Sequence, residues 1–140
     1  MKLIVDANIL FAALIKEGVT AELLISDKLQ LFAPEYLFEE FSKYEQLILD
    51  KTYRSEKDFN RILELLKEQI TTISKTEITP YIDEIVDISP DPKDTVYLAL
   101  AFAIKASIWS NDKELKEKQN VIKVWTTAEL INEVDLVKSK

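Results

Sequence analysis

The sequence predicts an α/β fold in which a parallel sheet is covered by helices on both faces. Short apolar runs alternate with longer segments of helical periodicity, which is the pattern of repeated β-α units. The chain has one glycine and four prolines, so helices joined by short loops are expected rather than linkers. A length of 140 residues is that of one domain, and we expect a single domain over residues 1–140.

One β-α unit and a second helix open the chain. Residues 2–5 (KLIV) are typical of a short buried strand, and a helix follows through residues 9–15. Thr20 is suited to cap another helix through residues 21–26, because its hydroxyl can accept a bond from a free N–H of the first turn.

The middle of the chain is expected to be mainly helical. Pro34 should end a strand at residues 29–33, because proline cannot donate to a ladder of hydrogen bonds. Ser55 is the expected N-cap of an amphipathic helix, and Thr79-Pro80 should start a later helix. The elements that follow Pro34 are helices at 35–51 and 55–70, a weak strand at 71–74 and a helix at 81–88.

The last third contains the most apolar helix. Asp91-Pro92 should open a helix through residues 94–105, and this helix is apolar nearly all round, so it should be buried. Thr126 and Glu129 form a capping box for the last helix. The other expected elements are a strand at 106–110, a short charged helix at 112–118 and a strand at 121–125.

The composition excludes several kinds of site. Without cysteine there is no disulfide and no thiolate metal site, and without histidine there is no catalytic triad and no ordinary zinc site. Chemistry must therefore use carboxylates, hydroxyls, amides, lysine or arginine. The longest apolar run, residues 96–104, is far short of the roughly 20 residues of a membrane span. The N-terminus is unlike a secretory signal, so a cytoplasmic protein without membrane contact is expected.

The net charge of −7 argues against nonspecific binding of nucleic acid, which depends on lysine and arginine at the phosphates. The charge is compatible with bound cations or with a basic partner.

Acidic residues follow the expected strands at one edge of the sheet. In open parallel sheets, ligands bind beyond the carboxyl ends of the strands. Asp6 ends the first strand, and Glu39 and Glu40 lie in early turns of the helix after the second. Asp94 lies in the first turn of the apolar helix, and Asp112 lies two residues past the third clear strand.

Helical geometry separates the two glutamates. At about 100° per residue, Glu40 lies about 70° from the centre of the apolar stripe of its helix and Glu39 about 170° away. Glu39 should therefore face solvent, and Glu40 should border the core. The residues of the stripe are Leu37, Phe38, Phe41, Tyr44 and Ile48.

Each of these residues also has a purely structural interpretation, and Glu40 can simply be the solvated flank of its helix. Asp6 can end a strand or cap a helix, and Asp112 can cap the short charged helix. Asp91 and Asp94 fit N-cap and N3 positions, where carboxylates satisfy free N–H groups. Asn8 can make a local turn contact.

Structural roles taken one by one do not explain why distant segments each bring a carboxylate to one edge. Three or four carboxylates in one cleft cannot all stay ionised without a compensating positive charge. Mg²⁺ or Mn²⁺ supplies that charge and prefers oxygen ligands. The residues thus predict a metal-dependent site and leave its substrate open.

Four segments in this order resemble the PIN-domain family of metal-dependent ribonucleases. They are the opening VDANIL, an acid within EYLFEEF, the D-x-x-D-x-x-x-L-A-L-A stretch from residue 91, and IWSNDKEL from residue 108. Together they span nearly the whole chain.

The resemblance implies that Asp6, Glu40, Asp94 and Asp112 form the acidic quartet, with Asn8 and Ser110 in support. It implies a three-layer α/β/α sandwich around a parallel sheet, one or two Mg²⁺ or Mn²⁺ ions, and cleavage of RNA. Many small members of the family are VapC-type toxins, so the resemblance also implies a homodimer and an antitoxin partner.

Two features depart from the family pattern. Asn111 stands where glycine is common, which could shift the approach to Asp112. The acidity of the chain does not favour RNA binding, although Lys93, Lys113 and Lys116 are expected near the mouth of the site.

Our hypothesis is phosphodiester hydrolysis by metal-activated water, with Asp6 and Asp94 as direct ligands. One alternative is an aspartate-based phosphatase, but that family needs Asp-x-Asp after the first strand and this chain has Asp6-Ala7-Asn8. The other is a non-catalytic interaction module with the PIN fold, whose acids would not converge or whose cleft would bind no Mn²⁺.

Overall fold

The computed structural model describes residues 1–16 and 18–138. Within these residues, five strands form one sheet in the order β3-β2-β1-β4-β5, and all of its neighbouring strands are parallel. The strands are β1 (Lys2–Val5), β2 (Gln30–Pro34), β3 (Ile70–Ile73), β4 (Ser107–Trp109) and β5 (Val124–Trp125). The predicted parallel α/β sheet is confirmed.

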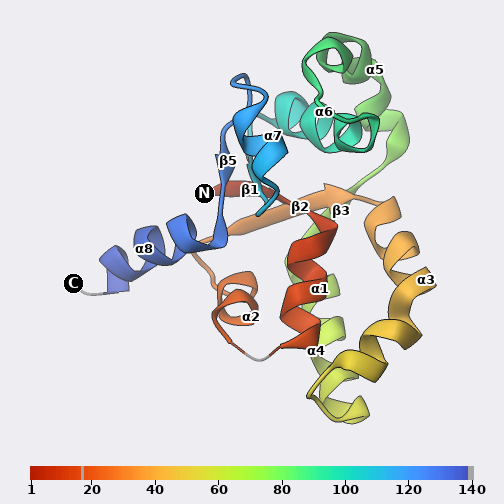
Figure 1. Cartoon of the computed structure of the whole chain (residues 1–140), viewed down its shortest axis with the longest axis vertical. Coiled ribbons are helices and arrows are strands. Elements are labelled where there is room, and N and C mark those ends of the chain that lie inside the picture. Colours follow the sequence, from red (N-terminus) through yellow and green to blue (C-terminus); the bar gives the residue numbers. More distant parts are fainter. Residues whose placement is uncertain (17, 139–140) are drawn as a thin grey trace.

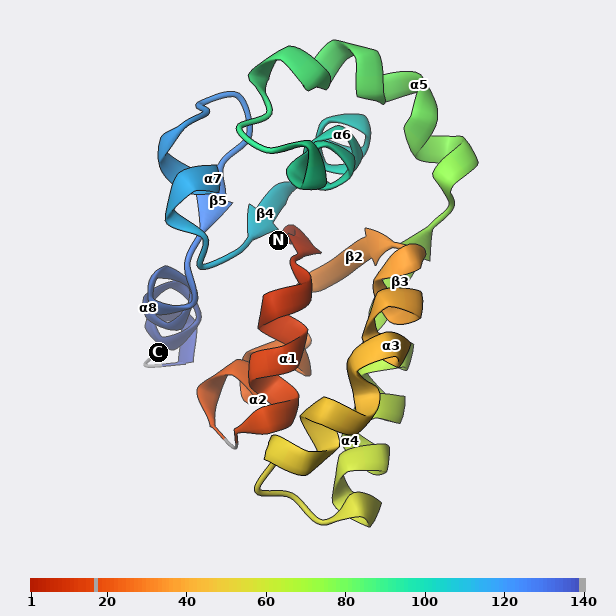
Figure 2. The same ribbon diagram turned by 45° about the vertical axis from the view of Figure 1, so that its right-hand side comes forward.

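Helices cover both faces of the sheet (Figures 1 and 2). Side chains of α1 to α4 and of α8 join one core cluster, and side chains of α5, α6 and α7 join a second cluster on the opposite face. The three layers agree with the expected α/β/α sandwich. The helices are α1 (Ala7–Ile15), α2 (Val19–Leu24), α3 (Tyr36–Lys51), α4 (Glu56–Gln69), α5 (Lys75–Ile85), α6 (Thr95–Ile104), α7 (Lys113–Glu117) and α8 (Thr127–Lys138).

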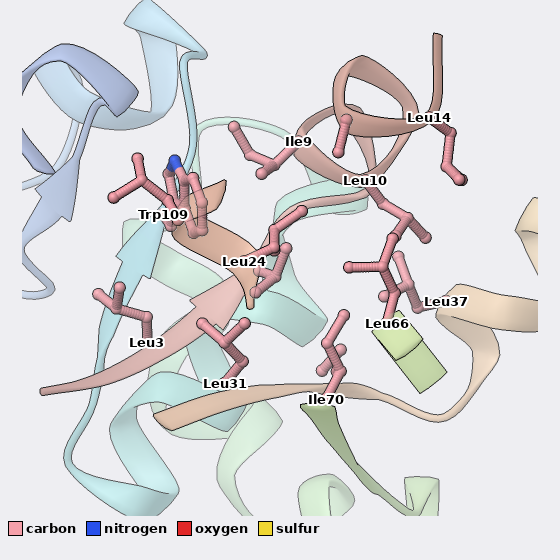
Figure 3. Packing of buried hydrophobic residues seen from close by; sticks show 14 of the residues in the cluster. Leu3, Ile9, Leu10, Leu14, Leu24, Leu31, Leu37, Leu66, Ile70 and Trp109 are labelled. Atoms are coloured by element: carbon pink, nitrogen blue, oxygen red, sulfur yellow. The ribbon is translucent and has the colours of Figure 1, made fainter. Parts of the chain in front are cut away.

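The central strands are apolar on both faces because both faces are covered. In β1, Leu3 and Val5 join the cluster under α1 to α4, while Ile4 joins the cluster under α5 and α6. All three side chains are fully buried. Each such side chain contributes roughly 1.5–3 kcal/mol of transfer free energy. Figure 3 shows Leu3 and Leu31 of the sheet in one cluster with leucines of the covering helices.

Two of the predicted caps are confirmed. The Ser55 side chain accepts a hydrogen bond of 3.1 Å from the backbone N–H of Asp58, at the start of α4. Thr126 and Glu129 bond reciprocally before α8: the Thr126 N–H donates to Glu129 Oε1 at 2.9 Å, and the Glu129 N–H donates to Thr126 Oγ1 at 3.2 Å.

The predicted cap at Thr20 is wrong. Helix α2 begins at Val19, so Thr20 lies inside it and Gly18 is the N-cap. Gly18 has a φ of 146°, a conformation that side chains disfavour. The one glycine of the chain therefore sets the start of this helix.

The predicted helix start at Thr79-Pro80 is also wrong. Helix α5 begins at Lys75, because the Ser74 side chain accepts a bond from the Glu77 N–H and caps it one turn earlier. Pro80 lies inside the helix, where it lacks the N–H that normally donates to the carbonyl four residues before. Pro80 and Thr76 are both exposed, so water can reach that carbonyl.

Two strand ends differ from the prediction. Pro34 is the last residue of β2, paired with Ile73, rather than the residue after it. β5 holds only the last two residues of the predicted strand at 121–125. The preceding backbone bonds instead to the buried Gln119 side chain, whose Oε1 accepts from the Val121 and Ile122 N–H groups.

Helix α6 contacts β1, β2 and β4, and its residues 97–101 are buried as predicted. Its last turn is not buried, because Phe102 is 40% exposed. Among the described residues, no helix combines the length and apolarity needed to cross a bilayer.

Candidate functional site

The site lies where the chain changes direction across the sheet. Strand β1 is central, with β2 on one side and β4 on the other, so β1 and β4 flank the topological switch point. Val5 pairs with Trp109, and the Asp6 N–H donates to the Trp109 carbonyl at 3.1 Å. Asp6 and Ser110 are therefore the first residues beyond the carboxyl ends of these two strands.

A cavity of about 470 Å³ opens at this edge. The four acidic residues that the sequence singled out all lie on its wall, together with Asn8. The residues that line it are Asp6, Ala7, Asn8, Phe11, Tyr36, Glu40, Tyr44, Asp91, Lys93, Asp94, Tyr97, Asp112 and Glu114. Carboxylates from four separate segments of the chain thus share one concave surface.

Ser110 forms hydrogen bonds with two of these acids, Asp6 and Asp112. It is fully buried, and its hydroxyl donates to Asp6 Oδ2 at 2.7 Å. The Ser110 hydroxyl oxygen in turn accepts the Asp112 N–H at 3.1 Å. Ser110 therefore fixes one oxygen of Asp6 and also the backbone from which the Asp112 side chain projects.

The structure separates the roles of Asp91 and Asp94. The Asp91 carboxylate accepts the Lys93 N–H at 2.9 Å and so caps the 3-10 turn Pro92–Asp94. Asp94 is the N-cap residue of α6, yet its side chain makes no capping bond. Its carboxylate is therefore available to the cavity.

Asp112 has both a structural and a cavity-facing role. Its Oδ1 accepts the backbone N–H groups of Glu114 and Leu115 and caps α7. Asp112 also lines the cavity. One oxygen is thus used by the helix, as the structural interpretation proposed, and the other takes part in no such capping bond.

Glu40 and Glu39 lie on different cavities. Both side chains are exposed, but only Glu40 lines the acidic cavity. Glu39 lines a separate, largely apolar cavity of about 420 Å³ together with Lys75 and Ile78. The two residues lie on different faces as predicted, but Glu40 is as exposed as Glu39 rather than set apart by burial against the core.

Burial and mutual repulsion raise the pKa values of two acids. Burial is the main cause for Asp94, followed by the charge of Asp112 and those of other nearby acids, and its pKa rises to about 6. Burial also raises the pKa of Asp6, although the Ser110 hydroxyl and the N–H groups of Asn8 and Ala7 oppose the rise. The cavity therefore favours a proton or another positive charge near these carboxylates.

This electrostatic strain predicts an unusual pH dependence of the metal-free protein. Because the folded state raises the pKa of Asp94 from 3.8 to about 6, folding takes up a proton between these values, and this contribution to stability is lost as the pH rises through that range. Solvent screening of a partly exposed carboxylate leaves an effect of about 1 kcal/mol. Urea unfolding in EDTA should show Asp94→Asn to be more stable than wild type at neutral pH, with the difference shrinking as the pH falls toward about 4. A difference that did not change with pH would contradict this origin.

The donor set is chemically suited to Mg²⁺ or Mn²⁺, since every candidate ligand is an oxygen. No three acidic side chains within residues 1–16 and 18–138 lie close enough together to hold an ion as a directly ligating group. Mg²⁺ usually keeps several waters and takes one or two protein carboxylates. The residues on the wall suit these ions in chemical type, and an ion held there would keep part of its water shell.

A family model described as a PIN domain matches residues 4–135. The chain belongs to the PIN-domain family. No curated protein is significantly similar to this PIN domain in sequence.

Its fold is also that of a solved structure. A chain in the crystal structure of VapBC2 from Rickettsia felis, bound to a DNA fragment from the promoter, superposes with a TM-score of 0.62. The two chains are 17% identical, and the match covers 90% of this PIN domain and 98% of the other chain.

Sequence reasoning missed the aromatic residues of the cavity. Tyr36 and Tyr97 line it, with ring centroids 6.0 Å apart in an edge-to-face arrangement. Burial raises the pKa of both hydroxyls. Phe11 and Tyr44 form a second aromatic pair on the wall. Their positions one turn after Asn8 and Glu40 were the available signal.

Only one of the three lysines expected at the mouth lines the cavity. Lys93 lies on its wall, whereas Lys113 and Lys116 do not. The prediction for Lys116 is wrong, because its ammonium group donates to the Val124 carbonyl at 2.6 Å and to Glu129 at 2.7 Å. The bond from Lys116 is the main reason why the pKa of Glu129 falls to about 2.

Asn111 has a structural role of its own. Its side-chain amide donates to Thr127 Oγ1 at 3.1 Å and accepts the Thr127 N–H at 2.9 Å. These bonds tie the end of β4 to the start of α8, and Asp112 still reaches the cavity.

Replacing Ser110 should test how far it organises the acids. Ser110→Ala leaves Asp6 without its hydroxyl donor, so we expect a loss of about 1–2 kcal/mol in stability at neutral pH. Were Asp6 a ligand of a divalent ion, this outer contact would orient it, and the affinity for Mn²⁺ should then fall by about 10- to 100-fold. Calorimetric titration and urea unfolding measure the two effects. Ser42→Ala is the control, because the Ser42 hydroxyl donates to the Phe38 carbonyl of its own helix at 2.9 Å and Ser42 does not line the cavity. Equal effects of the two substitutions would refute the role of Ser110.

Proposed function

We propose that this PIN domain is a metal-dependent endoribonuclease that hydrolyses RNA phosphodiester bonds at the acidic cavity, and that residues 1–140 form one domain. PIN domains are generally nucleases, which supports a hydrolase. The observation that carries the proposal is the meeting of Asp6, Glu40, Asp94 and Asp112 on one cavity wall. In a chain without histidine, such a set of carboxylates is the available means of phosphodiester hydrolysis.

In this proposal Asp6 and Asp94 hold Mg²⁺ or Mn²⁺ directly. Both have raised pKa values, so both gain most from an adjacent positive charge. Asp94 makes no capping bond, and Asp6 is oriented by Ser110. Glu40 and Asp112 lie on the same wall and would bind the ion through water, with Asn8 beside them.

The bound ion would lower the pKa of a water molecule and reduce the charge repulsion between the phosphate and the acids. The residues around the cavity hold the ligand carboxylates in place. Ser110 keeps Asp6 in one orientation, and α7 fixes the Asp112 carboxylate through its capping bonds. Among the residues that the structure describes, Lys93 is the cationic one that lines the cavity, where it can contact a phosphate oxygen.

We further propose that the protein is the toxin of a toxin–antitoxin pair and that it forms a homodimer. The likeness of its fold to a chain of the VapBC2 structure supports a partner of the antitoxin kind. A net charge of −7 and an acidic cavity would suit a basic segment of that partner. A neighbouring reading frame for a small basic protein is the expected genetic context.

Cleavage of an end-labelled, unstructured RNA tests the proposal. The wild-type protein should produce internal cuts in Mn²⁺ or Mg²⁺ and none in EDTA. Asp87→Asn is the matched control for asparagine substitutions at Asp6 and Asp94, because Asp87 is exposed on the turn Val86–Ile88 and does not line the cavity. The Asp87→Asn protein should cleave RNA like wild type. Absence of metal-dependent cuts in wild type would overturn the nuclease and favour a non-catalytic module.

A further inference from the structure

A large aromatic side chain is exposed at the rim of the acidic cavity. Tyr44 projects from α3 onto the cavity wall and is 48% exposed. Its neighbour Phe11, from α1, is half-buried and lines the same cavity. Figure 2 shows the two helices side by side below the sheet edge. The cavity thus combines carboxylates with an accessible aromatic ring.

The ring of Tyr44 rests on a series of packed aromatic side chains. It meets Phe11 edge-to-face, with centroids 6.3 Å apart and planes at 65°. Phe11 in turn packs against Phe41 at 6.1 Å, and Phe41 stacks on Phe59 at 6.4 Å. Phe41 and Phe59 are buried in the core. The Tyr44 ring is therefore supported from inside, so a ligand that binds to it loses little side-chain entropy.

The spacing along the helices places aromatic rings one turn from the polar side chains of the site. Tyr44 follows Glu40 by four residues on α3, and Phe11 follows Asn8 by three residues on α1. Side chains three or four residues apart share a helix face, at about 5–6 Å between Cβ atoms. A phosphate held near Glu40 would therefore place an adjoining base within reach of Tyr44.

The charge of the protein limits other ways of binding RNA. Lys93 is the one cationic residue on the described wall of the cavity, and the whole chain carries a net charge of −7. One phosphate contact by lysine gives a salt slope of only about 0.7 on single strands. Stacking of one base on an aromatic ring contributes roughly 10- to 100-fold in affinity and needs no positive charge.

We propose that Tyr44, supported by Phe11, is the stacking platform for an unpaired base of the substrate. The inference rests on the proposed nuclease function and assigns to Tyr44 the contact that would hold one unpaired base beside the acids. Duplex RNA is excluded because its bases are already stacked on each other and cannot reach the ring. The affinity for RNA should accordingly depend weakly on salt.

Binding of a short unstructured RNA that contains 2-aminopurine tests the platform without requiring cleavage, since the fluorescence of this base is quenched when it stacks. Ca²⁺ replaces Mn²⁺ so that the acids are neutralised while the RNA stays intact. Wild type and Tyr44→Phe should bind and quench alike. Tyr44→Leu should bind roughly 10-fold more weakly and lose the quenching. Tyr53→Leu is the control, because Tyr53 is 85% exposed and does not line the cavity.

The outcomes separate this inference from the nuclease proposal. Quenching that depends on Tyr44 in a protein that cuts no RNA would uphold the platform and reject the nuclease. The platform would be rejected, and the nuclease proposal kept, if wild type cleaves RNA and Tyr44→Leu has the same KM and the same fluorescence quenching as wild type. Failure of wild type to bind the RNA would also reject the platform. So would a Tyr44→Leu protein that changes only its oligomeric state in sedimentation, since that result assigns the ring to a protein interface.

Discussion

Asp94→Asn should lower the rate of Mn²⁺-dependent RNA cleavage by about 100-fold or more, because it removes a negative ligand from the proposed ion. The same change should make the metal-free protein more stable at neutral pH, since burial and neighbouring acids raise the pKa of Asp94 to about 6. A variant that loses activity and gains stability would show that the Asp94 carboxylate destabilises the fold and is needed for cleavage. Single-turnover cleavage and urea unfolding measure the two effects on the same preparation.

Asp6→Asn is the companion change and should reduce cleavage to a similar extent. Its effect on stability differs, because the Asp6 carboxylate accepts the Ser110 hydroxyl at 2.7 Å and so also has a structural contact. Asp87→Asn makes the same chemical change outside the cavity. It should leave the cleavage rate unchanged and alter the free energy of unfolding by no more than about 0.5 kcal/mol. Undiminished cleavage by Asp94→Asn would remove this residue from the site.

Trp109→Ala should cost about 3–5 kcal/mol of stability, a large share of the total for a domain of this size. Trp109 is fully buried next to Ser110, at the end of β4, and its indole N–H donates to Thr127 Oγ1 at 3.0 Å. The change leaves a cavity in the core and an unsupported end of β4. Urea unfolding followed by circular dichroism measures the loss.

Trp109→Phe separates the two contributions. It keeps an aromatic ring but loses the bond to Thr127 and part of the volume, so we expect a cost of about 1–2 kcal/mol. Equal costs for alanine and phenylalanine would show that the indole bond, and not packing, dominates at this position.

Much of the fold follows from local sequence patterns. Leu3, Ile4 and Val5 predicted a strand buried on both faces, and Ile4 does pack on the opposite side from the other two. Caps were predictable where one side chain decides them, as Ser55 does for α4. The start of α5 was predicted wrongly at Thr79-Pro80, because the side chain of Ser74 caps the helix about one turn earlier.

The candidate site was predictable in its acids and not in its aromatic wall. The rule that ligands bind beyond the carboxyl ends of parallel strands applies to Asp6 and Asp112, which are linked through Ser110 and share one cavity. The position of Tyr44 depends on its packing against Phe11 of another helix. Its spacing of four residues from Glu40 places Tyr44 on the same helix face as that acid, but the packing that holds its ring at the rim involves another helix and is not visible in the sequence.

The sequence also did not show which of Asp91 and Asp94 caps a helix and which leaves its carboxylate open to the cavity. Both residues fit capping positions, and only the geometry shows that Asp91 makes the capping bond while Asp94 does not. The choice depends on the 3-10 turn at Pro92–Asp94, which residue types alone do not specify.

Calorimetric titration with Mn²⁺ tests most directly whether one divalent ion links these negatively charged side chains. Wild type should bind the ion, and its melting temperature should rise with Mn²⁺ concentration as expected for a ligand of the folded state. In the double variant Asp6→Asn, Asp94→Asn both the binding heat and the rise should disappear while the circular dichroism spectrum is kept. A wild-type protein that neither binds Mn²⁺ nor gains stability from it would contradict the account.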